Sequence, residues 1–468
     1  MQVKSNDFIA VSDIAVIDEQ LQAAVIKGTT NATAGRERAM FVHGEDHTLR
    51  IRQQAAEAKR RALRKLPDLL EQAETNMQAN GINVLWANDA DDVHQQLMQI
   101  VRKHHVKRIA KSKSMMTEEI GLNTLLEAQN LEVIETDLGE YIIQLNNEPP
   151  SHIIAPVLHR TKAEIRDIFV RELGMTPTDD AEEMVAFARQ KLRDVFLDAD
   201  MGISGGNFVI AETGTLGLVM NEGNGRMVTT LPRVHVAIIG IEKIVETVED
   251  YALLTQVIAR SGTGQNITVY TNIINAPRQN NDEDGPDEVY VIFVDNGRSD
   301  IYATKYAEAL ACIRCGACLN VCPVYRATGG HAYGWVYSGP IGAVITPLYT
   351  GLENASPLPY ASSLCGACKQ ACPVDIDLPR MLLDLRHDIV EAGENGTMWD
   401  MGLKSWAIAN SSPRLFEMGG KASQIGRNNF GGQDLPGVLG NWTKYREFPE
   451  FAPKTFRQLW RERKNNNG

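Results

Sequence analysis

The chain has 468 residues, of which 43% are hydrophobic, enough for about two to four globular domains with a real core. Its formal net charge of -12 argues against nucleic acid as a general partner, because phosphate binding needs a basic surface. The first residues, MQVKSNDFIAVSD, lack the basic start and apolar core of a secretory signal, so we expect a cytoplasmic protein.

The N-terminal third changes from weak patterning to a regular alternation. Roughly the first forty residues are mixed, and residues 50–80 predict helix, broken near Pro67 and ended at Gly81. Short apolar runs then alternate with amphipathic stretches, which predicts strands at 82–87, 106–111 and 131–136 with helices at 89–105 and 114–130 between them. This order is typical of parallel strands joined by right-handed crossovers.

The middle of the chain becomes richer in strands. Two further helices are predicted at 161–173 and 179–199. Strand candidates follow at 207–213, 215–221, 235–241, 266–273 and 288–296. We therefore expect a helical extension at 1–65, an α/β domain at 66–297, a cysteine-rich domain at 298–390 and a C-terminal region at 391–468, helical at first and then extended.

All seven cysteines fall in two short runs near the C-terminus. The first is CIRCGACLNVCP, from Cys312 to Pro323, and the second is SSLCGACKQACP, from Ser362 to Pro373. The two runs agree at every cysteine except the first. At the position of Cys312 in the first run, the second run has Ser362. A secreted disulfide framework would spread its cysteines through a smaller chain, so this pattern indicates metal binding.

The spacing indicates how the thiols are shared between two clusters. In two-cluster ferredoxins the cysteine before the proline ligates the cluster of the other run. The first [4Fe–4S] cluster would then use Cys312, Cys315, Cys318 and Cys372. The second would use Cys322, Cys365 and Cys368, with Ser362 as a candidate for its fourth position. Nearby Arg314, Arg326 and Lys369 would favour the extra electron.

Two other uses of the cysteines fit less well. Structural zinc wants closed sites of four ligands, and seven cysteines would make one such site and leave three over. A redox disulfide from the Cys-x2-Cys pairs would leave the matching repeat unexplained. The role of Ser362 stays open: its oxygen binds iron, the iron is left to another ligand, or the cluster has only three irons, while the plain alternative is a residue that ends a turn.

One uncharged stretch and one glycine-rich loop need separate interpretation. Residues 332–352 are long enough to span a bilayer, but two prolines and four glycines favour a packed irregular loop, not a transmembrane segment. This loop would cover the clusters or serve as ordinary core packing. In the loop GISGGNFVIAETGTLG, backbone N–H groups could bind an anion, although turns in a glycine-rich sheet explain the pattern equally well. The ligand-binding candidates there are Gly205, Gly206, Asn207, Glu212, Thr213 and Thr215.

Several of these stretches together resemble one known family. SKSMMTEEIGLN, DMGISGGNFVIAETGTLGLVMNEGNGRM, LPRVHVAIIGIEKIV and the two cysteine runs resemble the lactate utilization protein B family over roughly residues 40–460. The resemblance implies a LUD-type domain, similar in fold to the sugar-phosphate isomerase and CoA-transferase-like group, followed by two [4Fe–4S] clusters on the seven cysteines. It further implies an electron-transfer component that works with two companion proteins in oxidising L-lactate to pyruvate.

Physical chemistry favours a relay over a complete catalyst. Lactate oxidation removes two electrons, whereas iron–sulfur clusters pass electrons singly, and the chain has no dependable dinucleotide fingerprint. We therefore expect protein electron donors or acceptors. The alternatives are a self-sufficient enzyme on a small acid or CoA-like ligand with structural or sensing clusters, and a scaffold that holds zinc.

Overall fold

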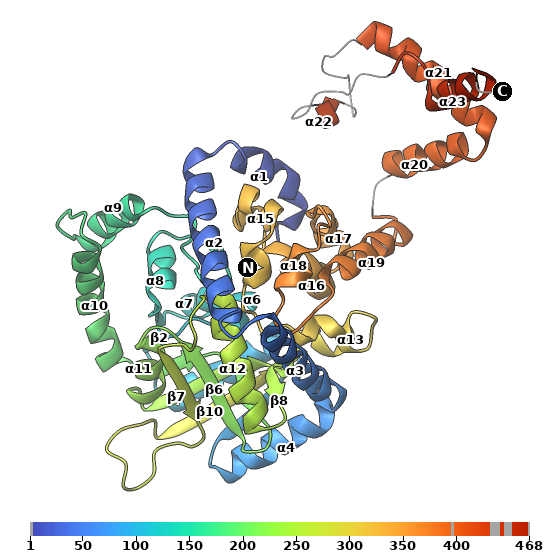
Figure 1. Ribbon diagram of the computed structural model, residues 1–468. Helices are drawn as coiled ribbons and strands as arrows, with labels where there is room; N and C mark the ends of the chain where they lie inside the picture. The colour runs from blue at the N-terminus through green and yellow to red at the C-terminus, as the bar shows by residue number, and fades with distance from the viewer. Residues whose placement is uncertain (1–2, 395–396, 431–439, 444–451, 467–468) are drawn as a thin grey trace. The chain divides into compact units, whose positions relative to one another are not determined.

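The computed structural model describes residues 3–394, 397–430, 440–443 and 452–466 (Figure 1). The chain divides into two compact units, Met1–Glu391 and Ala392–Gly468. The first unit contains both sheets and all seven cysteines.

A six-stranded parallel sheet forms the centre of the first unit, in the order β1-β10-β7-β4-β2-β3. Every residue of β7 is buried, as expected for a parallel strand covered on both faces. In the register, Val236 of β7 lies opposite Tyr290 of β10 and Ile203 of β4. The strands are β1 (Asn83–Ala87), β2 (Arg108–Lys111), β3 (Glu132–Glu135), β4 (Met201–Ser204), β7 (Val234–Gly240) and β10 (Glu288–Val294).

A second, four-stranded sheet has the order β8-β5-β6-β9. Its strands are β5 (Phe208–Ile210), β6 (Thr215–Met220), β8 (Ile244–Val245) and β9 (Tyr270–Ile274). The antiparallel pair β5 and β6 turns at Gly214, where φ is +62° and an added Cβ would lie 2.4 Å from the backbone nitrogen of Met77. Only glycine fits this turn, because a side chain would collide with the helix beside it.

Helices cover both faces of the parallel sheet. Leu97 and Val101 of α5 pack with Ile238 on one face, and Met77 of α4 packs with Val291 on the other. The helices of this domain are α4 (Leu66–Ala79), α5 (Ala90–Lys103), α6 (Met115–Glu119), α7 (Leu122–Glu127), α8 (Leu138–Leu145), α9 (Lys162–Leu173), α10 (Ala181–Asp198), α11 (Asn224–Thr230), η2 (Ile241–Lys243) and α12 (Val248–Gly262). The expected helix at 114–130 is two helices, because Gly121 between them adopts a left-handed conformation.

The N-terminal forty residues, which show little pattern in sequence, are helical. They form η1 (Ser5–Asp7), α1 (Phe8–Ala15) and α2 (Glu19–Met40), followed by α3 (Glu45–Arg64). Helix α2 contacts α12 on one side and α14 (Ala317–Asn320) and α15 (Pro323–Thr328) on the other. Tertiary packing thus stabilises a helix whose threonines and asparagine give it low intrinsic propensity.

The cysteine-rich part consists of short helices packed into one core. They are α13 (Arg298–Tyr302), η3 (Ala307–Ala311), α14, α15, η4 (His331–Tyr333), α16 (Gly339–Thr350), α17 (Leu352–Ala355), η5 (Leu358–Tyr360), α18 (Ala367–Ala371) and α19 (Leu378–Glu391). Helix α16 corrects the expectation of an irregular loop at 332–352. Pro340 lies in its first turn, where an amide hydrogen has no partner within the helix, and burial of residues 339–347 compensates for Pro347 inside it.

The second unit is helical where the structure describes it. It contains α20 (Thr397–Asn410), α21 (Pro413–Phe430), α22 (Gly440–Thr443) and α23 (Phe456–Asn466). Helix α23 corrects the expectation that the chain ends in an extended tail, although residues 431–439 and 444–451 lie outside the described part. Among the described residues, no helix has both the length and the apolar character needed to cross a membrane.

Candidate metal centre and adjoining cavity

The two cysteine runs adopt the same backbone conformation. Two residues after Cys312 and after Ser362 stand Arg314 and Leu364, both with positive φ, 59° and 54°. The glycines two positions further on, 316 and 366, are left-handed as well and begin the short helices α14 and α18. The sequence repeat is therefore also a structural repeat, including positions that are strained for non-glycine residues.

Four thiols form one electrostatic group. Burial has the largest effect on Cys318, and the charges of Cys312, Cys315 and Cys372 then each raise its pKa further. Cys372 also raises the pKa of Cys315 after the effect of burial. Cys372 comes from the second run, so the fold brings a thiol of that run beside three thiols of the first.

The other three thiols form a second group. Burial and then the charge of Cys322 raise the pKa of Cys368 to about 12, with a smaller contribution from Cys365. Cys365 is exposed, and a hydrogen bond from the backbone of Ala367 lowers its pKa. Cys368 also raises the pKa of Cys318, so the two groups adjoin.

Ser362 occupies the place that Cys312 holds in the first run. The sulfur of Cys312 accepts a hydrogen bond from the backbone N–H of Arg314 at 3.4 Å. The hydroxyl oxygen of Ser362 accepts the equivalent bond from Leu364 at 3.1 Å. The side chain thus points in the direction that a cysteine at this position would take.

Arginines from the N-terminal helices hold the second run in place. Arg36 of α2 donates to the carbonyl of Ala371 at 3.1 Å, and Arg52 of α3 donates to those of Cys372 and Lys369 at 3.1 and 3.3 Å. Because the conformation of this loop places its thiols, the N-terminal helices contribute to the candidate metal centre.

The donor set fits iron–sulfur clusters better than single ions. Four thiolates around one zinc ion lie about 3.8 Å apart, given a Zn–S bond of about 2.3 Å. Within the described residues, no three of the seven sulfur atoms lie within 4.8 Å of one another. Two adjoining groups of four and three soft thiols, spread more widely than one ion needs, fit two clusters that transfer single electrons when bound.

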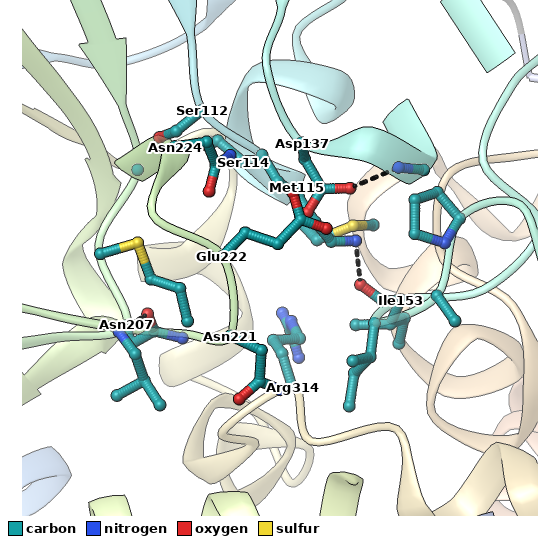
Figure 2. Close-up of a pocket in the computed structure, with 18 of the residues that line it drawn as sticks. Ser112, Ser114, Met115, Asp137, Ile153, Asn207, Asn221, Glu222, Asn224 and Arg314 are labelled. Carbon is teal, nitrogen blue, oxygen red and sulfur yellow. Dashed lines mark hydrogen bonds between the residues drawn. The ribbon is translucent and has the colours of Figure 1, made fainter. Parts of the chain in front are cut away.

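A cavity of about 690 Å³ lies beside the first cysteine run, at the carboxyl ends of the parallel strands (Figure 2). Ser112, Lys113 and Ser114 follow β2, and Gly205, Gly206 and Asn207 follow β4. Glu242 and Lys243 follow β7, and Arg298 follows β10. Arg314, which lies between Cys312 and Cys315, is also part of the wall.

A buried charge network forms the wall between this cavity and the cysteines. Arg298 donates to both carboxylate oxygens of Glu119 at 2.9 Å and to Glu242 at 2.6 Å. Burial alone would raise the pKa of Glu242, but the charges of Arg298 and then Lys243 lower it to about 2. The guanidinium of Arg314 lies over the ring of Tyr337, 4.8 Å from its centroid, and 3.8 Å from Glu242. Through Glu242 and Arg314, this charge network at the cavity wall is therefore coupled to the loop that contains Cys312.

A pair of carboxyl groups faces the cavity from another side. Burial and then the charge of Asp137 raise the pKa of Glu222 to about 7, and Figure 2 draws the two side chains close together. Asp137 caps α8 and has a raised pKa, chiefly because it is buried. Glu222 as a whole residue is exposed, so solvent weakens the interaction between the two.

The six ligand-binding candidates do not all lie together. Gly205, Gly206 and Asn207 line the cavity. Glu212, Thr213 and Thr215 are not among its lining residues. Thr213 and Thr215 hydrogen-bond each other at 2.7 Å, and Glu212 accepts from the backbone of Val248 at the start of α12.

Sequence reasoning missed Lys243 and Arg298 as residues of this site. The available signal was their position, since each charged residue follows a continuous apolar strand within a few residues.

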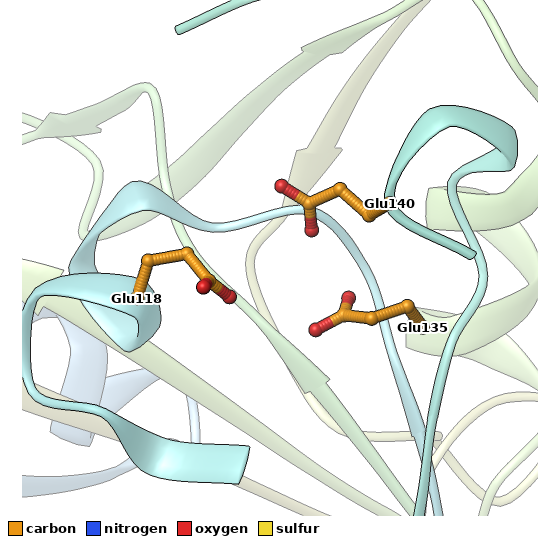
Figure 3. Close-up of side chains that lie close together, drawn as sticks. All are labelled: Glu118, Glu135 and Glu140. Atoms are coloured by element: carbon orange, nitrogen blue, oxygen red, sulfur yellow. The ribbon is translucent and has the colours of Figure 1, made fainter. Parts of the chain in front are cut away.

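Three glutamates elsewhere in the domain have oxygens within 4.8 Å of one another, namely Glu118, Glu135 and Glu140 (Figure 3). The buried ammonium of Lys111 pairs with Glu118 at 3.2 Å and with Glu135. Burial and then the charge of Glu135 raise the pKa of Glu140 well above its ordinary value. One buried lysine and one protonated carboxyl group therefore account for this cluster.

Family models match three successive parts of the chain. Residues 70–294 match the LUD domain family, residues 308–376 match the 4Fe-4S dicluster domain family, and residues 385–465 match the family called lactate utilisation protein B, C-terminal. Fold and sequence together thus define an α/β LUD-domain protein with a 4Fe-4S dicluster domain, as expected from the sequence.

Several full-length relatives carry the name lactate utilization protein B. One from Bacillus velezensis is 44% identical over 423 residues, which cover 89% of each chain. One from Bacillus subtilis strain 168 is 44% identical over 416 residues, with 88% of this chain and 87% of the relative covered. The chain belongs to the lactate utilization protein B family.

A comparison with solved structures finds a DUF162 family protein from Deinococcus radiodurans. It is 15% identical, with a TM-score of 0.28, and the match covers 49% of this chain and 98% of that one. A likeness at this score carries no argument about the present chain.

Proposed function

We propose that this chain is the iron–sulfur electron-transfer component of a multi-protein cytoplasmic system that oxidises L-lactate to pyruvate. The family name supports a role in lactate utilization, and the dicluster domain supports iron–sulfur clusters. The observation that carries the electron-transfer role is the pair of adjoining thiol groups, because neighbouring clusters pass electrons on singly.

In this proposal the chain holds two [4Fe–4S] clusters. Cys312, Cys315, Cys318 and Cys372 hold the first, and Cys322, Cys365 and Cys368 hold the second with Ser362 at its fourth position. The electrostatic neighbours of Cys318 and Cys368 support this crossed assignment. The second cluster is the more labile, since it has one thiol fewer and Cys365 is exposed.

The proposal also divides the work between chains. The segment 66–297 forms the LUD-type domain and 298–390 the cluster domain, with 1–65 and 391–468 as helical flanking regions. Two companion lactate-utilization proteins supply the two-electron chemistry and the electron acceptor, because clusters alone do not split an electron pair.

Oxygen-free purification followed by iron and sulfide assays tests the cluster content. We expect a brown protein with about eight iron atoms per chain if both clusters are complete. L-lactate should then reduce the clusters only when the companion proteins are present. A colourless protein that holds zinc would overturn the proposal.

The cavity favours one alternative, an enzyme that acts on a small acid or CoA-like ligand without companions. Its carboxyl pair and its cations could serve such chemistry. Turnover by the purified chain alone distinguishes this function from a relay.

A further inference from the structure

The cavity lies at the position where the parallel sheet reverses its direction of winding. Strand β2 connects to β3 on one side, whereas β4 connects through the following segments to β7 on the other. The neighbours β2 and β4 therefore flank the switch point, and open α/β sheets bind ligands in the crevice outside the strand ends there.

The loops after these two strands touch each other at the cavity wall. A Cβ added to Gly205 would lie 2.6 Å from the hydroxyl oxygen of Ser114. Both residues line the cavity. The absence of a side chain at Gly205 thus lets the two loops approach, and the crevice that they border is part of the fold itself.

Cationic groups at the wall facing the cysteines lack full partners. Within the part of the chain that the structure describes, the buried Nη1 atom of Arg314 has no hydrogen-bond partner, and only 8% of this residue is exposed. Among the described residues, the ammonium of Lys243 has one ion-pair contact within 4 Å, at 3.9 Å from Glu242. Glu242 is already shared with Arg298 at 2.6 Å. The contacts to Glu242 are long, 3.8 Å from Arg314 and 3.9 Å from Lys243, so both buried cations are only partly compensated. Because incomplete compensation of a buried charge is costly, this arrangement fits an additional anion.

The rest of the cavity is mainly apolar. Side chains such as Ile142, Phe169, Met184 and Leu218 line it away from the cations. A cavity of about 690 Å³ is far larger than a three-carbon acid needs and lies within the usual range for ligands of drug or cofactor size.

We propose that this cavity binds an organic anion with an apolar body, whose anionic group lies against Arg314 and Lys243 beside the Cys312–Cys315 loop. This inference does not rest on the proposed electron-transfer function, because neither the switch point nor the cation pair involves a thiol. It adds a ligand site in the LUD domain whose occupant would lie next to the candidate first cluster.

Fluorescence titration of the full-length chain, purified without oxygen, tests the proposal. The probe is anilinonaphthalene sulfonate, an organic anion with an apolar body, and the uncharged phenylnaphthylamine is its matched neutral counterpart. We expect Lys243→Gln and Arg314→Gln each to weaken binding of the anionic probe roughly tenfold, as for loss of one charged contact. Binding of the neutral probe should stay unchanged, because the apolar walls are intact.

One control variant and a second test variant make the result decisive. Lys107→Gln removes an exposed cation outside the cavity wall and should leave both titrations unchanged. Lys243→Gln keeps the test valid if Arg314→Gln disturbs the neighbouring cysteine loop. The proposed site does not exist if the wild-type chain fails to bind the anionic probe. The same conclusion follows if both variants bind this probe as tightly as the wild-type chain does. Lactate-dependent reduction is measured separately, so failure of the site and failure of the relay are distinguishable.

Discussion

At the scale of single residues, Ser362 is the point where the two cysteine runs differ. Its backbone follows that of Cys312, and its hydroxyl accepts the same kind of hydrogen bond that the sulfur of Cys312 accepts. Only the donor atom differs. An alkoxide oxygen is harder than a thiolate and matches iron–sulfur chemistry less well, so under the proposed assignment the second site would have the weaker ligand set.

Replacement of Ser362 by cysteine should therefore complete the second site. We expect Ser362→Cys to slow the loss of iron in air several-fold, since four thiolates retain iron better than three. Iron content and visible absorbance followed over time provide the measurement. Ser405→Cys, on an exposed position of α20 and outside the cysteine-rich part, is the control and should change nothing. Equal rates of iron loss in Ser362→Cys and wild type would argue against a ligand role for this position.

The crossed assignment makes a second prediction at this scale. Cys372→Ser should disturb the cluster held by Cys312, Cys315 and Cys318, although the change lies in the other run. Paramagnetic spectra of the reduced protein distinguish the two clusters by comparison with Cys365→Ser. If Cys372→Ser and Cys365→Ser alter the same signal, each run serves its own cluster and the assignment is wrong.

At the scale of elements, the sequence predicts the helices and strands whose hydrophobic pattern is local. It does not predict those that depend on packing against distant parts of the chain. Strands β1, β2, β3 and β10 lie within predicted runs, and β7 begins one residue before its run. The central strands β7 and β10 are the clearest, because parallel strands covered on both faces are apolar along nearly their whole length. The short strand β4 escapes prediction because Met201–Ser204 is only four residues and contains glycine. Helix α2 escapes because its partners α12, α14 and α15 lie far away in sequence.

The same distinction applies to the candidate site. Short-range spacing identifies the seven thiols as candidates, since their ligand pattern is local. The charge network is not local: Arg298 meets Glu242 across 56 positions and Glu119 across 179. Such contacts depend on the order of strands in the sheet, which periodicity does not contain.

The contact of α3 with the second cysteine run gives a prediction at this scale. Arg52→Gln removes charged hydrogen bonds to the carbonyls of Cys372 and Lys369, worth about 1.5–3 kcal/mol each. We expect faster loss of iron and a lower thermal unfolding midpoint. Arg50→Gln, on an exposed position of the same helix, should leave both unchanged. If Arg50→Gln and Arg52→Gln behave alike, α3 does not hold the cysteine loop.

At the scale of the whole first unit, a buried charge network and a buried histidine join the LUD domain to the cysteine-rich part. Tyr337 donates to Glu119 at 2.7 Å, which connects the core around α16 with α6 of the α/β domain. Nε2 of His152 lies 3.1 Å from Oδ1 of Asn320, between Cys318 and Cys322. The two family domains therefore share one set of buried polar contacts, and a change on one side should reach the other.

Removal of the central arginine should destabilise the unit strongly. Arg298→Met leaves Glu119 and Glu242 as buried carboxylates without their main partner, which costs about 3–5 kcal/mol of unfolding free energy. Arg278→Met removes an arginine from an ion pair with Asp287 whose side chains are 42% and 45% exposed, and should cost no more than about 1 kcal/mol. Denaturant unfolding compares the two variants. A cost for Arg298→Met as small as that for Arg278→Met would show that the network does not stabilise the fold.

His152 makes the contact between the domains sensitive to acid. Burial, with a smaller effect from the charge of Lys113, lowers its pKa from an ordinary 6.5 to about 4. Its Nδ1 accepts from the backbone of Ile154 and Ala155, so the folded chain requires the neutral ring. As the pH falls below about 6.5 the unfolded chain takes up a proton that the folded chain does not, and stability decreases until about pH 4.

Between about pH 7 and pH 5 this difference should cost the wild-type chain about 2 kcal/mol of unfolding free energy. His152→Gln is less stable near pH 7, because it loses the packing and hydrogen bonds of the ring, but it lacks this proton linkage. Its deficit relative to wild type should therefore shrink by about the same amount as the pH falls to about 5. His387→Gln, at an exposed position on α19, is the control and should show a pH dependence parallel to that of wild type. If the curves of His152→Gln and wild type stay parallel over this range, His152 is not the group that links the domain contact to pH.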